Sequence, residues 1–224
     1  MANGAAQHSR ISEPTPALRM FAARKRVFVD LLRWDVPVFE DRYERDQFDD
    51  GSAHYLSLDD GHAHWASARL LDTRRPHILG SLFPLLCTAS VPCGPTVREI
   101  TRFCIDPTLN AVDRRKARNA LVMGLVHHAL AHGITAYTGV AEIGWFRQIE
   151  QFGWTCRALG SPQAHHGRTL VGLIIRINGS TPSTMGPLGP VDPNVLRLLH
   201  SFGGEGDRER PFFSSSYAAQ FASA

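Results

Sequence analysis

Lysine and long hydrophobic runs are what this chain of 224 residues most clearly lacks. It has 2 lysines against 22 arginines, a bias that genomic base composition explains, and its net charge is only +3. No apolar run approaches the roughly 18 residues of a membrane-spanning helix, and the polar N-terminus lacks the apolar core of a signal peptide. The four cysteines include no Cys-x-x-Cys pair, so reduced thiols are expected. The sequence therefore predicts a cytoplasmic protein without a membrane span.

Several functional motifs are also missing. The chain has no P-loop, no Gly-x-Gly-x-x-Gly dinucleotide fingerprint and no zinc-ligand spacing. His128 and His132 stand one helical turn apart, but Ala129 replaces the glutamate of the His-Glu-x-x-His pattern, so no metal site is predicted. Cys104 has no histidine nearby that would mark it as a nucleophile. Binding to nucleic acid is not expected, because both a basic-aromatic motif and a strong positive charge are missing.

The spacing of apolar residues predicts one domain of mixed α and β structure. A polar leader covers residues 1–16 and the domain covers residues 17–178. The expected order is a helix over 17–33, a long ordered loop over 34–52, a hairpin around the Asp-Gly turn at 59–61, a strand over 97–105, a helix over 113–132, and then a strand, a helix and two strands between 134 and 177. Strands followed by a βαβ unit favour an α/β or α+β fold with a mixed sheet.

The C-terminal residues have a different composition. Residues 179–224 are rich in Gly, Pro and Ser and are predicted to be an extension that ends in a flexible tail. Within it, residues 193–202 could form a short helix.

The strand segment VREITRF, residues 97–103, has an unusual pattern. Simple alternation would put Glu99 and Arg102 on opposite faces, and neither face would be cleanly apolar. A β-bulge would bring Glu99 and Arg102 to one side. The alternative to a functional role is that Glu99 and Arg102 form an ordinary surface ion pair on an edge strand.

A set of charged and aromatic residues surrounds this strand in the sequence. In chain order they are Arg24, Phe28, Trp34, Asp46, Asp49, Arg69, Phe83, Glu99 and Arg102. In their local contexts, RKRVFVDLLRWDV, RDQFDD, ARLLD, LFP and EITRF, they resemble the hallmark positions of the acyl-homoserine-lactone synthases, the autoinducer synthases of bacterial quorum sensing. The resemblance covers roughly residues 18–177, and Thr101 stands where the family often has serine.

The resemblance implies both a fold and a reaction. The fold is like that of the N-acetyltransferases, with three layers, α-β-α, and a mixed central sheet splayed to admit an acyl thioester. In the reaction, S-adenosylmethionine and an acyl thioester of acyl carrier protein or coenzyme A give an N-acyl-homoserine lactone and methylthioadenosine. S-adenosylmethionine is then a substrate, and no metal or other cofactor is expected. The alternatives are an N-acyltransferase of the same fold that acylates another amine without forming a lactone, and a binding protein without catalysis.

Under this resemblance the residues divide into a catalytic pair and a binding set. A free α-amino group has a pKa of about 8, so Glu99 could take its proton directly or through a water, with Arg102 beside it. The aromatic faces of Trp34 and Phe28 suit a sulfonium, and the arginines suit a carboxylate. Residues expected to contact S-adenosylmethionine are Arg24, Phe28, Trp34, Asp46, Asp49, Arg69, Phe83 and Phe103.

The acyl donor is expected to meet the βαβ half of the chain. Candidate residues of the acyl pocket are Thr138, Val140, Ile143, Trp145, Phe146 and Ile149. In the family, a hydroxyl on this strand accompanies acyl chains oxidised at carbon 3, which points to Thr138. The preceding helix begins with a basic group, Arg114, Arg115, Lys116 and Arg118, and lacks the glycine-rich pyrophosphate loop of acetyl-CoA enzymes. This group is predicted to dock an acidic carrier protein, the plain alternative being a solvated helix start.

Overall fold

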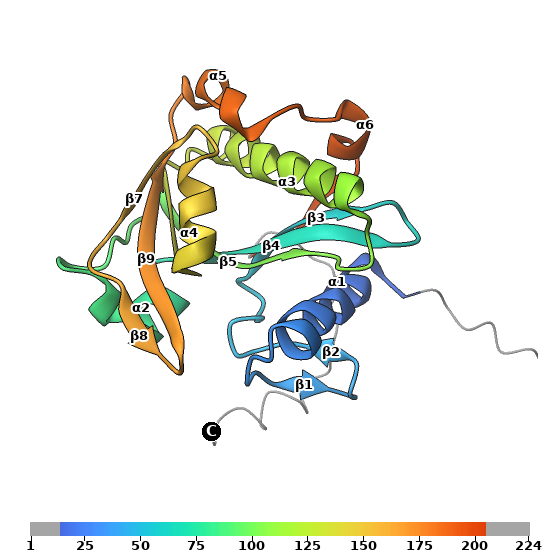
Figure 1. Ribbon diagram of the computed structural model, residues 1–224, viewed down its shortest axis with the longest axis horizontal. Coiled ribbons are helices and arrows are strands. Elements are labelled where there is room, and N and C mark those ends of the chain that lie inside the picture. The colour runs from blue at the N-terminus through green and yellow to red at the C-terminus, as the bar shows by residue number, and fades with distance from the viewer. Residues whose placement is uncertain (1–13, 205–224) are drawn as a thin grey trace, which may run out of the picture.

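A mixed sheet of eight strands with helices on both faces forms the body of the molecule (Figure 1). The computed structural model describes residues 14–204. The helices are α1 (Pro16–Arg24), α2 (Ile78–Leu82), α3 (Ala111–Ala131), α4 (Ile143–Glu150), α5 (Thr181–Thr184) and α6 (Pro193–Leu196), with the π-helix η1 (Lys25–Leu31) and the 3-10 turns η2 (Pro84–Leu86) and η3 (Gly186–Leu188). The strands are β1 (Val38–Phe39), β2 (Tyr43–Glu44), β3 (His54–Asp59), β4 (His64–Asp72), β5 (Val97–Ile105), β6 (Ala136–Glu142), β7 (Thr155–Ala158), β8 (Gln163–His165), β9 (Arg168–Arg176) and β10 (Leu199–Gly203). Across residues 14–204, every helix is too short or too polar to span a membrane.

The main sheet is splayed in its middle. Its strand order is β10-β3-β4-β5-β6-β9-β7, with β8 paired to β9. The parallel neighbours β5 and β6 pair only where Val97–Glu99 lies beside Ala136–Thr138, although both strands continue well beyond this contact. Gly139 allows the close approach at the end of the pairing, because a Cβ there would lie 3.0 Å from the carbonyl oxygen of Ile100. Beyond it, the two halves of the sheet diverge.

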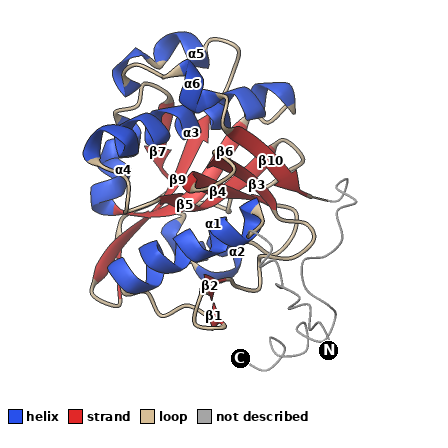
Figure 2. Cartoon of the chain, turned by 90° about the vertical axis from the view of Figure 1, so that its right-hand side faces the viewer, coloured by secondary structure: helices blue, strands red, loops and turns tan. Residues whose placement is uncertain are grey.

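The two faces of the sheet carry separate cores. On one face, α3 and α4 bury Leu121, Leu125 and Phe146 in the larger core. On the other face, α1 packs Met20 and Phe21 in a smaller cluster against β3 and β4. Figure 2 shows α3 and α4 on one side of the strands and α1 and α2 on the other. The predicted three-layer α-β-α fold with a splayed mixed sheet is therefore confirmed.

The first helical segment changes its winding halfway along. Thr15 caps α1 by accepting the backbone N–H of Leu18 at 3.3 Å, and Pro16 occupies the first turn, where its missing N–H costs nothing. After α1, the chain continues as the π-helix η1, a form often found at functional sites. The N–H of Trp34 then donates to the carbonyl of Phe28 at 2.8 Å, so the chain folds back and both rings lie together. The helix predicted over 17–33 is confirmed, but its π-helical half was not predicted.

The C-terminal extension packs onto the same domain. Residues 179–204 carry α5, η3, α6 and β10. Met185, Leu188 and Val195 are buried in the larger core with residues of α3. The folded unit therefore continues past the boundary predicted at residue 178.

The helix predicted over 193–202 is only partly correct. Helix α6 ends at Leu196, and residues 199–203 form β10, which pairs antiparallel with β3. The apolar spacing of this short stretch fits a helix and an edge strand equally well, and pairing with β3 decides between them. Residues 1–13 of the predicted leader and 205–224 of the predicted tail lie outside the described residues.

His64, in the β3–β4 hairpin, is buried, and neither of its ring nitrogens has a hydrogen-bond partner among the described residues. Burial lowers the pKa of His64 to about 4, although the carboxylates of Asp106 and Asp59 raise it. A histidine in an unfolded chain has a pKa of about 6.5. Between these values the unfolded chain binds a proton that the folded chain does not. The contribution of neutral His64 to the free energy of unfolding is therefore complete above about pH 6.5. It is lost as the pH falls toward 4.

Replacing His64 with leucine should make the stability less dependent on pH. We expect His64 to account for a loss of up to about 3 kcal/mol in the free energy of unfolding between pH 6.5 and pH 4. Urea titrations at a series of pH values would measure this slope in the wild type and in His64→Leu. His62→Leu, at an exposed histidine of the same hairpin, is the control and should keep the wild-type slope. The same slope in His64→Leu and the wild type would contradict the assignment.

Candidate active site

A β-bulge in β5 gives the site its shape. Strands β4 and β5 pair in register as far as Thr101 and again from Cys104, so Arg102 and Phe103 lie opposite a single residue of β4. Arg102 adopts a positive φ of 50°, which is uncommon for a residue other than glycine. The bulge turns Arg102 to the face that carries Glu99 and Thr101, and it turns Phe103 to the α4 face. The predicted bulge that brings Glu99 and Arg102 to one side is confirmed.

Three arginines and three carboxylates form a buried network between α1 and the sheet. This charged cluster consists of Arg24, Arg69, Arg102, Glu44, Asp46 and Asp49. The guanidinium of Arg24 binds Asp49 through two bonds of 2.7 Å and donates to Glu44 at 2.6 Å. Burial by itself would raise the pKa of Asp49, but the charges of Arg24 and Arg69 outweigh it and hold that pKa well below its ordinary value. Asp49 is therefore ionised at neutral pH.

The other two arginines close the network. Arg69 donates to the two oxygens of Asp46 at 2.6 and 3.1 Å and to Thr101 Oγ1 at 2.9 Å. Arg102 bridges Glu44 at 2.9 Å and Asp46 at 2.7 Å. Positive and negative charges balance, as a buried set of ions requires. Asp46 and Asp49, which were expected to contact S-adenosylmethionine, thus bind arginines of the chain itself.

One member of this network, Glu44, and one residue that donates to it, Tyr55, were not predicted from the sequence. Glu44 contacts both Arg24 and Arg102 and is fully buried. The hydroxyl of Tyr55 donates to Asp49 at 2.8 Å. The acidic composition of residues 34–52 was the available signal for Glu44, and three acids of that loop have their partners in the three arginines.

An aromatic pair lies directly against the charged cluster. Phe28 and Trp34 stack with their ring centroids 4.7 Å apart. The guanidinium of Arg102 lies 5.4 Å from the centroid of Phe28 and 5.7 Å from that of Trp34. Arg24 and Arg69 are almost completely buried, whereas the side chain of Arg102 keeps 8% exposure. Of the three arginines predicted to hold a substrate carboxylate, Arg102 is the one that borders the aromatic pair.

Glu99 lies at the last pair of residues that joins β5 to β6. It is opposite Thr138 in the parallel register and is fully buried. Its carboxylate accepts the N–H groups of Ile78 at 2.7 Å and Leu79 at 2.6 Å, at the start of α2. Burial raises the pKa of Glu99, and these N–H groups together with His77 and Arg69 offset the rise only in part. A carboxylate with a raised pKa, placed where the sheet opens, has the properties of a general base.

The predicted acyl-pocket residues lie on β6 and α4, along the diverging half of the sheet. Thr138 is fully buried, and its hydroxyl has no hydrogen-bond partner among the described residues. Phe146 and Ile149 belong to the larger core. Trp145 faces Phe103 across the opening, with ring centroids 5.4 Å apart. The remaining predicted members, Val140 and Ile143, are half-buried.

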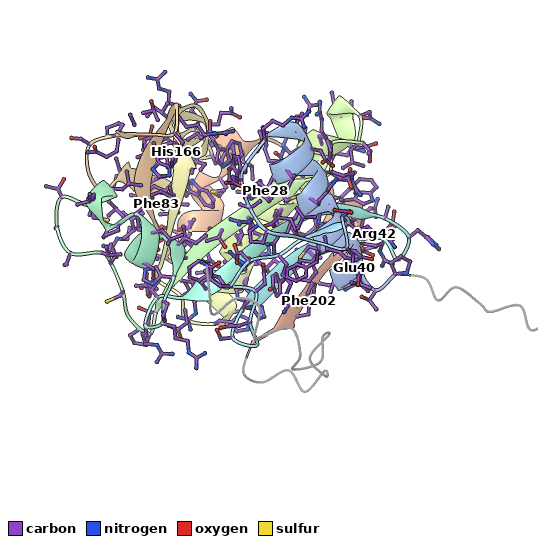
Figure 3. All side chains as sticks on the ribbon, turned by 90° about the horizontal axis from the view of Figure 1, so that it is seen from below. Phe28, Glu40, Arg42, Phe83, His166 and Phe202 are labelled. Atoms are coloured by element: carbon purple, nitrogen blue, oxygen red, sulfur yellow. The ribbon has the colours of Figure 1, made fainter. Side chains whose placement is uncertain are left out.

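Phe83 lies apart from the aromatic pair. It follows α2 and makes an edge-on contact with His165 of β8 at 5.1 Å between centroids. Figure 3 shows Phe83 and Phe28 on separate parts of the molecule, with His166 of the β8–β9 turn above Phe83. The structure therefore does not bring Phe83 next to Phe28 and Trp34.

The basic group at the start of α3 divides into two pairs. Arg114 and Arg115 are exposed. Lys116 forms an ion pair with Asp192 at 3.4 Å, and Arg118 lies over the ring of Phe152 at 5.3 Å. Asn110 caps this helix by accepting the N–H groups of its first turn. Two of the four predicted docking residues thus have partners inside the chain.

The structure thus has a splayed mixed sheet between two helical layers, the fold that the resemblance implied, and a buried carboxylate where the sheet opens. The family model described as autoinducer synthase matches residues 8–181, and the chain belongs to the autoinducer synthase family. It is therefore an acyl-transferring enzyme, as the sequence motifs predicted.

Individual relatives agree with this assignment. The acyl-homoserine-lactone synthase of Rhizobium radiobacter is 32% identical over 187 residues, which cover 81% of this chain and 85% of the relative. The solved structure of the CoA-dependent acyl-homoserine lactone synthase MesI matches with a TM-score of 0.69 and 26% identity, over 78% of this chain and 88% of that one. TofI, solved with an inhibitor and MTA, matches with a TM-score of 0.64 and 28% identity, over 82% and 96% of the two chains.

Proposed function

We propose that this chain is an acyl-homoserine-lactone synthase that acts in the cytoplasm on S-adenosylmethionine and an acyl thioester. The observation that carries the proposal is the position of Glu99, a buried carboxylate at the point where β5 and β6 part. An acyl thioester enters between the diverging strands, and the amine reaches the same point from the face that carries the charged cluster.

In the first step the amine attacks the thioester carbonyl. A C–N bond forms, the C–S bond breaks, and the thiol leaves with a proton. Glu99 takes the proton of the amine, directly or through a water, since each carboxylate oxygen keeps a lone pair beyond its bond to the N–H of Ile78 or Leu79. The bulge at Arg102 and Phe103 supplies backbone donors for the oxyanion, and losing one such donor typically costs about 3 kcal/mol.

In the second step the product closes to a lactone. The carboxylate of the methionyl part attacks its own γ-carbon, and the bond from that carbon to sulfur breaks. The electron pair goes to the sulfonium, which leaves as neutral methylthioadenosine. Arg102 holds the carboxylate, because it borders the aromatic pair and is less buried than Arg24 or Arg69. The face of Trp34 receives the sulfonium.

The acyl chain lies along β6 and α4. Thr138 has a buried hydroxyl that lacks a partner within residues 14–204, and such a group is costly unless a ligand satisfies it. An oxygen at carbon 3 of the acyl chain would accept this hydrogen bond, so we assign Thr138 to the recognition of 3-oxo or 3-hydroxy chains. Arg114 and Arg115 are assigned to docking of an acidic carrier protein, since both are exposed at the capped start of α3.

Mass spectrometry of the products tests the proposal. The purified chain would be incubated with S-adenosylmethionine and acyl thioesters of both carriers, in several lengths, with and without an oxygen at carbon 3. We expect an acyl-homoserine lactone to form one-for-one with methylthioadenosine. Thr138→Val, which keeps the shape but removes the hydroxyl, should lose about tenfold in preference for the oxidised chain. Equal preference in Thr138→Val and the wild type would contradict the role of Thr138.

The same experiment separates the alternative function. An N-acyltransferase that acylates another amine would give acylated product without release of methylthioadenosine. A binding protein without catalysis would give neither product with any thioester.

A further inference from the structure

Arg168 joins the two halves of the splayed sheet at their open end. It is the first residue of β9, directly after the turn marked by His166 (Figure 3). Its guanidinium forms an ion pair with Glu142, the last residue of β6, and donates to the backbone carbonyl of Leu32, which follows η1. Glu142 belongs to the half of the sheet that carries α4, and Leu32 packs with Phe28 over β5 on the other half. The ion pair with Glu142 lies within the β6–β9 half, and the bond to Leu32 crosses the gap that opens where β5 and β6 part.

The same side chain also contacts the aromatic pair. The guanidinium of Arg168 lies 5.9 Å from the ring centroid of Trp34, and that of Arg102 lies 5.7 Å from it. Trp34 is only two residues from Leu32, whose carbonyl Arg168 binds. Arg168 thus fixes both the ring and the backbone segment that carries it. On the other half of the sheet, Leu32 and Trp34 pack with Phe28 and with Cys104 of β5.

We propose that Arg168 is a positioning residue of the S-adenosylmethionine site, which it completes by tying the segment of Trp34 to the β6–β9 half of the sheet. The inference rests on the proposed function. Arg168 acts through Trp34 and does not contact the reacting atoms. When the tie is intact, the ring stands in place for the adenosyl sulfonium before the substrate arrives, and less conformational freedom is lost on binding.

Removing the side chain of Arg168 should weaken binding of both S-adenosylmethionine and methylthioadenosine. We expect Arg168→Ala to raise the Kd for methylthioadenosine and the KM for S-adenosylmethionine by about tenfold each, the order of effect of a misplaced orienting group. The KM for the acyl thioester should stay within about twofold. Arg168→Lys, which keeps the charge but not the planar pair of donors, should give an intermediate value. Glu142→Gln should weaken binding in the same direction.

Arg176→Ala is the matched control, because Arg176 is an exposed arginine at the other end of β9. It should keep the wild-type constants. The Arg168–Glu142 pair is partly exposed, so its loss costs little stability and Arg168→Ala should remain folded. Calorimetric titration with methylthioadenosine, which needs no acyl donor, gives the binding constants.

Three outcomes would overturn the inference. The first is unchanged binding in Arg168→Ala, and the second is a rise in KM for the thioester alone. The third is tighter binding of S-adenosylmethionine with unchanged binding of uncharged methylthioadenosine, which would show direct repulsion between the Arg168 cation and the sulfonium and not positioning. Failure of the wild type to bind either nucleoside would instead refute the proposed function on which the inference rests.

Discussion

Replacing Glu99 with glutamine should lower kcat by about two to four orders of magnitude, the usual range for loss of a general base. Glutamine has the shape of glutamate but takes no proton from the amine. Glutamine also keeps the volume of glutamate, so the charged cluster and the aromatic pair stay in place, and the Kd for methylthioadenosine should change by no more than about threefold. Single-turnover rates and calorimetric titration would measure both quantities. Glu150→Gln, at an exposed carboxylate of α4, is the control and should have wild-type kinetics.

Glu99 also binds the start of α2, so a lower rate in Glu99→Gln would follow from a displaced α2 as well as from the loss of a base. The pH dependence of the rate separates these two explanations. The carboxylate accepts the N–H groups of Ile78 and Leu79, so Glu99→Gln also places an amide nitrogen against one backbone donor and lowers stability. If Glu99 served only to accept the N–H groups of α2, the pH dependence of the rate would not follow its protonation. Burial raises the pKa of Glu99, so the acid limb of kcat/KM in the wild type should lie above the pKa of an ordinary glutamate. A residual rate in Glu99→Gln that keeps this limb would contradict the role of base.

The elements that could be predicted from the sequence are those whose signals are local. Helix α3 has an apolar stripe through Leu121 and Leu125, a capping side chain at Asn110 and a glycine stop at Gly133, whose φ is 66°. The Asp-Gly turn similarly fixed the β3–β4 hairpin. The elements that were missed include β1, β2, α2, β8, α5 and β10, which have two to five residues each. Elements of this length form because a neighbouring strand or a carboxylate binds them, and such partners are distant in sequence.

The site shows the same division between local and distant signals. The irregular alternation around Glu99 and Arg102 was enough to predict a bulge, because a bulge is a local departure from pairing. Glu44 and Arg168 gave no comparable signal. Each is an ordinary charged residue in the sequence, and its importance depends on partners 20 to 136 residues away. The sequence alone did not divide the three arginines between a substrate carboxylate and the carboxylates of the chain, because the ion pairs of Arg24 and Arg69 join residues that are distant in sequence.

Replacing Arg24 with methionine should destabilise the fold by about 3 to 5 kcal/mol, the cost of leaving a buried charge without its partner. Arg24 makes three bonds in the charged cluster, two to Asp49 and one to Glu44. Methionine fills a similar volume, so the main effect is electrostatic: three carboxylates would then share two arginines. Urea unfolding at pH 7 would measure the change. The loss should be smaller at low pH, because the unpaired carboxylates can then take up protons.

A neighbouring residue offers the control for this stability change. Lys25 pairs with Asp30 at 2.8 Å on the surface, with 26% and 48% of the two side chains exposed. Lys25→Met should therefore cost no more than about 1 kcal/mol, as surface ion pairs generally do. Adding Asp49→Asn to Arg24→Met restores the balance of charge in the cluster and should recover part of the stability, whereas independent effects would simply add. If Arg24→Met costs no more than Lys25→Met, or if Asp49→Asn deepens the loss in full, the cluster is not held together by the pairing of its charges.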